Sequence, residues 1–376
     1  MVWERKTLGE VCNINSGNPA PQKKESFEEG IYPFFRTSDV GKIHLGIIYD
    51  SKDKLNENGI KGLTLYKKGT LLFPKSGAST FLNHRVILGR DGYVSSHLAT
   101  IKAKRDILDD KFLFYLSINI DARDLMQDQN YPSLRLSDIQ NINILVPSIQ
   151  EQRQIVKIIE ESFEKIAKAK ENAEKNLKNA KEIFEGYLQN VFKNKSKDWE
   201  TKKIDDVCYV EYGTRVVQKR DGGTIYPVYG GGGATFFMDK PNREDCLVIA
   251  RFGMSENCTR FIKGKFFLND SGLSITPKDK ERLSQEFLNY EIFYLNDDIY
   301  SLGKGTAQKN LDVPSFRNMN ISFPNSLIEQ QLLVKKLNSL SSETKKLEEI
   351  YQQKLEDLEE LKNSILQKAF NGELIK

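Results

Sequence analysis

The sequence patterns that most often mark catalysis are present in this chain only as fragments. A phosphate-binding loop requires a glycine, four further residues and then Gly-Lys-Ser/Thr. The stretch from Gly303 to Thr306 superficially resembles that loop, but Asp298 stands at the position of the first glycine. The four glycines at 230–233 lack the spacing and the following helix pattern of a dinucleotide fingerprint. We therefore expect no catalytic residue and no cofactor.

Histidine and cysteine do not indicate a metal centre either. His44, His84 and His97 have no obvious catalytic partner in the sequence, and such isolated histidines are usually surface or core residues. The chain has four cysteines and no CxxC pair. In a cytosolic protein this favours reduced thiols in the core. We expect no metal site.

Polar and basic residues recur instead in loops that also contain glycine and aromatic residues. Arginine can pair with guanine and glutamine with adenine, whereas hydroxyl groups can hold phosphates. Ordinary solvated loops have a similar composition, so composition alone leaves that alternative open. The candidate DNA-contacting residues are Arg36, Thr37, Lys75, Arg85, Tyr131, Ser133, Arg135, Tyr212, Arg215, Lys219, Arg220, Arg251, Thr306, Gln308 and Lys309.

The bulk properties set only wide limits. A chain of 376 residues is expected to form two or three domains. Its net charge of +4 does not force a nucleic-acid partner. The sequence has no apolar run of membrane-spanning length and no signal-peptide pattern. We expect a cytoplasmic protein.

The elements that must position these loops are two long helices with a heptad-like apolar repeat. Each follows a proline and begins with a capping box, Ser148 with Glu151 and Ser326 with Glu329. Asn371 and Gly372 are expected to end the second helix. Such a repeat needs a partner helix, and the expected seam consists of Ile159, Phe163, Ile166, Phe184, Leu337, Leu340, Leu347, Leu358, Leu361 and Ile365.

The two halves of the chain also repeat one another. Trp3 and Trp199, Cys12 and Cys208, and Gly17 and Gly213 are separated by the same number of residues. This indicates a tandem duplication with a globular domain at 1–147, a helix at 148–197, a second domain at 198–325 and a second helix at 326–376. Short β-type runs, such as 70–73, and one helix per domain, near 110–117 and 284–295, predict loop-rich α+β domains.

This organisation resembles the specificity subunit of a type I restriction-modification enzyme. The resemblance covers nearly the whole chain and is carried by the repeated Trp-x-x-x-x-Leu/Ile-x-x-Val-Cys start and the repeated entry to a long helix. The stretch from Gly305 to Leu311 is also common in target-recognition domains of that family, and the first half departs from it around Tyr131 and Ser133.

The resemblance implies two target-recognition domains that are separated by an antiparallel coiled coil, with internal pseudo-twofold symmetry. The chain would bind double-stranded DNA at two half-sites with a fixed gap. It would dock methylation subunits, two of them in the usual arrangement, and through them restriction subunits. It would itself be non-catalytic. The alternatives are a coiled-coil scaffold that binds proteins and, more remotely, a nucleotide-binding enzyme that uses Gly303 to Thr306.

Overall fold

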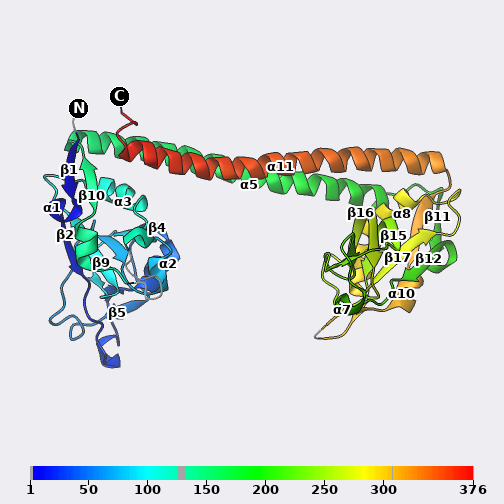
Figure 1. Cartoon of the computed structure of the whole chain (residues 1–376), viewed down its shortest axis with the longest axis horizontal. Helices are drawn as coiled ribbons and strands as arrows, with labels where there is room; N and C mark the ends of the chain where they lie inside the picture. The colour runs from blue at the N-terminus through cyan, green and yellow to red at the C-terminus, as the bar shows by residue number, and fades with distance from the viewer. Residues whose placement is uncertain (1–2, 126–132, 307, 376) are drawn as a thin grey trace. The chain divides into compact units, whose positions relative to one another are not determined.

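The computed structural model describes residues 3–125, 133–306 and 308–375. They form two compact units, Met1–Asn172 with Lys354–Lys376 and Ala173–Gln353. Each unit contains one globular domain and one segment of each long helix (Figure 1). The predicted α+β class and the two long helices are therefore confirmed.

The first globular domain precedes the first long helix. Its strands are β1 (Glu4–Thr7), β2 (Cys12–Ser16), β3 (Tyr32–Phe35), β4 (Leu45–Ile48), β5 (Asp53–Leu55), β6 (Leu71–Pro74), β7 (Arg85–Leu88), β8 (Tyr93–Val94), β9 (Leu98–Ala103) and β10 (Asn143–Val146). Its α-helices are α1 (Leu8–Val11), α2 (Thr37–Ile43), α3 (Asp110–Ile118) and α4 (Leu136–Gln140).

The second globular domain lies between the two long helices in the sequence. Its strands are β11 (Trp199–Lys203), β12 (Cys208–Tyr212), β13 (Tyr226–Tyr229), β14 (Phe237–Met238), β15 (Arg243–Ala250), β16 (Thr259–Leu268), β17 (Gly272–Pro277), β18 (Gly303–Lys304), β19 (Asn310–Leu311) and β20 (Asn320–Pro324). Its α-helices are α6 (Ile204–Val207), α7 (Gln218–Asp221), α8 (Gln285–Tyr294), α9 (Asn296–Ser301) and α10 (Val313–Arg317).

The central strands of the main sheet follow an equivalent order in the two domains. The order is β2-β9-β6-β7-β4 in the first domain and β12-β17-β15-β16-β13-β14 in the second. The register also matches, because Ser16 pairs with Ala99 as Tyr212 pairs with Leu273. Each domain also has a two-stranded ribbon next to its long helix, β1 with β10 and β11 with β20. The common topology supports the duplication that the sequence predicts.

Gly17 and Gly213 show why the repeat preserves a glycine after this first strand of the sheet. A Cβ atom at Gly17 would lie 2.2 Å from the backbone oxygen of Ser95, and one at Gly213 would lie 1.9 Å from that of Asn269. No side chain fits at either contact. The equivalence fixes which residues of the two domains correspond to one another.

The long helices are α5 (Ile149–Lys193) and α11 (Leu327–Phe370). In the first unit the start of α5 packs beside the end of α11, because Ile155 and Ile159 belong to the same core as Leu366 and Phe370. Lys170 also donates to Glu359 over 2.8 Å. The pairing is therefore antiparallel in this unit (Figure 1).

The second unit pairs the opposite segments of the same helices. Leu188 and Phe192 near the end of α5 share a core with Val334 and Leu337 near the start of α11. Ala173 and Ala180 are also buried, and they belong to the 4–3 repeat of α5. The seam is thus continuous with the globular core in each unit.

Helix starts and ends follow the predicted signals in most respects. The hydroxyl of Ser148 accepts from the backbone N–H of Glu151, and the backbone N–H of Ser148 donates to the Glu151 carboxylate. At the second start, the described residues show no hydrogen bond between Ser326 and Glu329, and the Glu329 carboxylate accepts from the Trp199 indole over 3.3 Å instead. Helix α11 ends at Phe370, and Gly372 adopts a left-handed φ of 78°.

Candidate nucleic-acid interface

Two of the predicted residues in the first domain are held at the start of α2. Arg36 precedes α2 and forms an ion pair with Asp53 at 2.5 Å, and its guanidinium lies over the Phe34 ring. Thr37 is the first residue of the helix. The ion pair partly neutralises Arg36, so a phosphate would have to compete with Asp53 for it.

Lys75 and Ser133 are brought together at the end of β6. The backbone N–H of Lys75 donates to His97, and the backbone oxygen of Lys75 accepts from Leu134 over 2.8 Å. Ser133 forms an isolated bridge with Ser76. Arg135 is exposed just before α4. Tyr131 lies outside the described residues.

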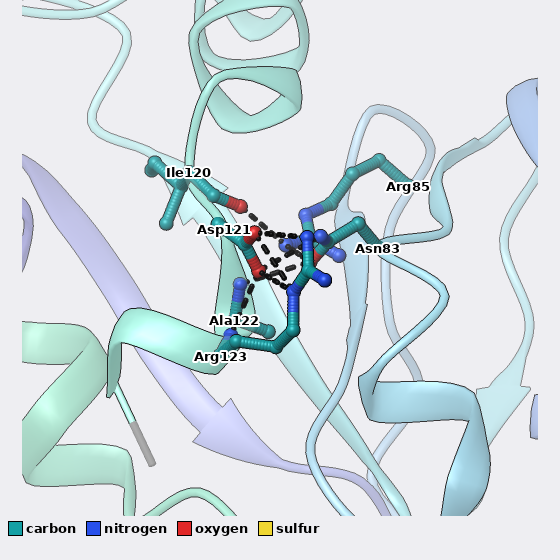
Figure 2. Close-up of polar contacts among 6 residues, drawn as sticks. All are labelled: Asn83, Arg85, Ile120, Asp121, Ala122 and Arg123. Carbon is teal, nitrogen blue, oxygen red and sulfur yellow. Dashed lines mark hydrogen bonds and ion pairs between the residues drawn. The ribbon is translucent and has the colours of Figure 1, made fainter.

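The structure gives Arg85 an internal place, in contrast to the expected DNA contact. Its side chain is fully buried, and its guanidinium donates to the backbone oxygens of His84, Ser117 and Ile120. The same group lies 3.6 Å from the centre of the Phe73 ring. Figure 2 shows it beside Asn83, which links it to Asp121. We therefore no longer count Arg85 among the DNA-contacting candidates.

In the second domain, Arg251 follows β15 and its guanidinium contacts two aromatic rings. Its guanidinium carbon is 4.7 Å from the centre of the Tyr212 ring and 4.3 Å from that of Phe252. Nη1 donates to the backbone oxygen of Asp270 over 3.2 Å. Tyr212 and Phe252 are 46% and 39% exposed. The sequence alone does not select Phe252, because only the structure shows that its ring lies against the Arg251 guanidinium.

The hairpin of β18 and β19 supports the Arg251 loop. The backbone N–H of Leu311 donates to Arg251, and that of Met254 donates to Lys309, both over 2.9 Å. A Cβ at Gly253 would lie 3.0 Å from Nε2 of Gln308. The predicted residues Tyr212, Arg251, Gln308 and Lys309 therefore come together on one surface although three separate segments supply them.

The other predicted residues of this domain lie on its surface. Arg215, Lys219 and Thr306 are exposed. Arg220 is exposed as well, and its Nε donates to Asp221 over 2.8 Å. Lys309 lies with its ammonium 3.9 Å from the centre of the Tyr300 ring. These positions suit phosphate contacts, which need only an accessible cation or donor.

Most residues of the expected helix seam are buried or partly buried. Ile159, Ile166 and Leu337 are buried. Partly buried positions are Phe163, Phe184, Leu340, Leu358 and Ile365. Leu347 and Leu361 are 38% and 48% exposed, so they lie at the edge of the seam or beyond it. Beside Leu361, the ammonium of Lys362 lies 5.3 Å from the centre of the Phe163 ring.

The cysteines are all buried and unpaired. Burial raises the pKa of Cys12 and of Cys208 to about 12. A thiol with such a pKa is almost entirely protonated at neutral pH and is a poor nucleophile. This agrees with their expected role as core residues.

Comparison with known families shows the family to which this chain belongs. The family model described as the type I restriction modification DNA specificity domain matches residues 2–178 and 196–357. The chain belongs to this family. It is a type I restriction-modification specificity subunit, a DNA-recognition component and not a catalytic one.

Curated relatives of this specificity subunit include two from Methanocaldococcus jannaschii. The MjaVIII specificity subunit is 23% identical, and the match covers 99% of this chain and 93% of that protein. The MjaIX specificity subunit is 29% identical over 44% of this chain and 38% of its own length. The EcoprrI specificity subunit of Escherichia coli is 22% identical, with 87% of this chain and 84% of that protein covered.

Solved structures share the fold. A chain from a study of complex assembly and conformational transition in the type I restriction-modification system has a TM-score of 0.81 at 20% identity, with 99% of this chain and 98% of that chain covered. The HsdS subunit from Thermoanaerobacter tengcongensis has a TM-score of 0.64 at 19% identity, with coverages of 99% and 97%. None of the helices in the described part of the specificity subunit is suited to cross a membrane.

Proposed function

We propose that this specificity subunit recognises a bipartite DNA target. Residues 1–147 and 198–325 would each act as a target-recognition domain that reads one half-site. The single observation that carries this proposal is the repeated sheet, whose loops at the ends of β6 and β15 present different side chains in equivalent places. Two related but unequal domains suit two short, unequal sequences.

The paired helices would set the gap between the half-sites. In each unit one end of α5 packs against the opposite end of α11 within the domain core, which would fix each domain on the helix pair. In other DNA-binding proteins, a fixed distance between the two DNA-binding units specifies the spacing of the half-sites. The exposed faces of the helices would dock methylation subunits, and restriction subunits would join through these.

Footprinting and exchange of one domain test the proposal. The assembled methyltransferase should protect two half-sites. Replacement of residues 1–147 by those of another specificity subunit should change one half-site and leave the other intact. If both half-sites changed together, the two domains would not act as separate readers.

The alternative of a protein-binding scaffold predicts a different response to salt. Binding through several phosphates weakens steeply as salt increases because counterions are released. Docking through apolar contacts lacks that dependence. A flat salt response of DNA binding would favour the scaffold.

A further inference from the structure

We propose that Arg251 reads a guanine in the major groove, whereas its counterpart Lys75 in the first domain holds a phosphate. This inference rests on the proposed bipartite recognition and assigns different roles to one repeated position. Both residues directly follow the equivalent strands β6 and β15. Phe73 pairs with Ala99 as Ile249 pairs with Leu273, so the register of the two strands is the same.

The backbone around the two residues is held in the same way. The N–H of Lys75 donates to His97 over 3.1 Å, and that of Arg251 donates to Ser271 over 2.9 Å. The backbone oxygen of each residue then accepts from a leucine, Leu134 or Leu311. The difference between the two sites therefore lies in their side chains.

The guanidinium of Arg251 is restrained by its contacts and forms no ion pair among the described residues. The Tyr212 and Phe252 rings lie against the guanidinium, and Nη1 donates to the backbone oxygen of Asp270. Among the described residues, no carboxylate pairs with Arg251, whereas Arg36 and Arg220 each have one. Bidentate pairing with O6 and N7 of guanine requires a planar donor in a fixed direction. The Nε–Nη2 edge of Arg251 donates to none of the described residues, so it is available for pairing with guanine.

Lys75 lacks this support. Ser16 and Ser76 stand at the positions of Tyr212 and Phe252. The hydroxyl of Ser76 is itself hydrogen-bonded to Nδ1 of His97 over 2.7 Å. A lysine on a flexible stem behaves as a point charge. It can neutralise a phosphate of any sequence but does not impose the direction that base recognition needs.

Selection from a pool of randomised duplex DNA tests the two roles, with the full chain in complex with the methylation subunits of its own system. The wild type should enrich a two-part motif with a guanine at one position of the second-domain half-site. Arg251→Lys keeps the charge, so it should leave low-salt binding to random duplex within about threefold. It should reduce the guanine preference at that position by roughly tenfold or more.

Two matched variants separate a reading role from a structural one. Tyr212→Leu removes a ring at an exposed position and should lower the same guanine preference, although Arg251 is still present. Lys75→Gln should weaken binding to all sequences alike and reduce the slope of log affinity against log salt by about one. Lys75→Arg should leave every base preference unchanged. An unchanged thermal transition in each variant confirms that the fold is retained.

The outcomes distinguish this inference from the function on which it rests. If the wild type enriches no two-part motif, the proposed function fails, and the inference fails with it. If the motif appears but Arg251→Lys leaves it intact or alters a position other than a guanine, only the inference is overturned. Loss of one base preference in Lys75→Gln would overturn the role given to Lys75.

Discussion

At the scale of single residues, Arg85 shows how burial changes the role of a charged side chain. It is positively charged and loop-adjacent in sequence, and those are the features of a DNA contact. In the fold it lies at the start of β7, where it ties the end of α3 to the sheet through backbone oxygens. Burial lowers its pKa to about 9, so it remains charged at neutral pH.

Arg85→Met should therefore lower the stability of the fold more than substitution of an exposed candidate DNA-contacting residue would. The change removes the guanidinium donor from the backbone oxygens of His84, Ser117 and Ile120 and leaves an apolar group in its place. We expect a loss of about 2–4 kcal/mol in the free energy of unfolding, measured by urea denaturation. Arg135→Met at an exposed site is the control, with a change within about 0.5 kcal/mol. Equal effects of the two variants would contradict the structural role.

Glu291 in α8 gives the second domain a pH-dependent stability. Burial raises its pKa to about 7, although the backbone N–H of Ser322 donates to one of its oxygens over 2.9 Å. Its Oε2 has no hydrogen-bond partner among the described residues. Between pH 4.5 and 7 the folded state binds more protons than the unfolded state. The contribution of Glu291 to the free energy of unfolding is therefore greatest below this range and is lost as pH rises through 7.

Glu291→Gln should flatten this dependence. The wild type should lose on the order of 3 kcal/mol of unfolding free energy between pH 4.5 and 8 that the variant retains. Unfolding followed at several pH values measures it, and Glu286→Gln at an exposed site of the same helix is the control. The equivalent helix position in the first domain is Leu116, which is apolar and buried. A variant with the wild-type pH profile would place the titrating group elsewhere.

At the scale of elements, two buried glutamines join the domains to the helices. Gln152 and Gln330 are fully buried near the starts of α5 and α11. The oxygen of Gln152 accepts from the backbone N–H of Asp109, and its nitrogen donates to Ile107 and Pro147. Gln330 makes the same three contacts, with Ser284, Arg282 and Pro324. One repeated side chain thus satisfies three backbone groups at each junction.

Gln152→Leu should destabilise the first junction by about 3 kcal/mol, because it leaves one N–H and two carbonyls buried without partners. Hydrogen exchange should become faster in α3, and the Gln330→Leu variant should show the same effect in α8. Gln154→Leu, on an exposed face of the same helix, should change little. Unaltered exchange in both junction variants would mean that apolar packing alone holds the joints.

Much of the arrangement of helices and domains could be predicted from the sequence. The duplication, both long helices, α3 and α8 follow from local signals: capping residues, the 4–3 apolar repeat and repeated motifs. Leu347 and Leu361 are more exposed than the 4–3 repeat predicts, because neighbouring positions compete for the interface and tertiary packing decides between them. The burial of Arg85 and the stacking of Phe252 depend on contacts distant in sequence, which composition and periodicity do not reveal.

At the scale of the whole molecule, the proposed gap depends on the length of the helix pair. One extra heptad in α5 with a matching heptad in α11 keeps the 4–3 repeat and lengthens the pair by about 10 Å. At roughly 3.4 Å per base pair, the gap should grow by about three base pairs. The half-sites themselves should not change, because the domains are untouched.

The assembled methyltransferase and a pool of duplexes with varied gaps measure this expectation. A heptad added to α5 alone is the control, since it shifts one helix against the other and should impair binding to every gap. If the double insertion recognised both half-sites at the original gap, the spacing would be set by flexible attachment of the domains. The helix pair would then serve for docking and would not set the gap, because an element that sets the gap must change it when its own length changes.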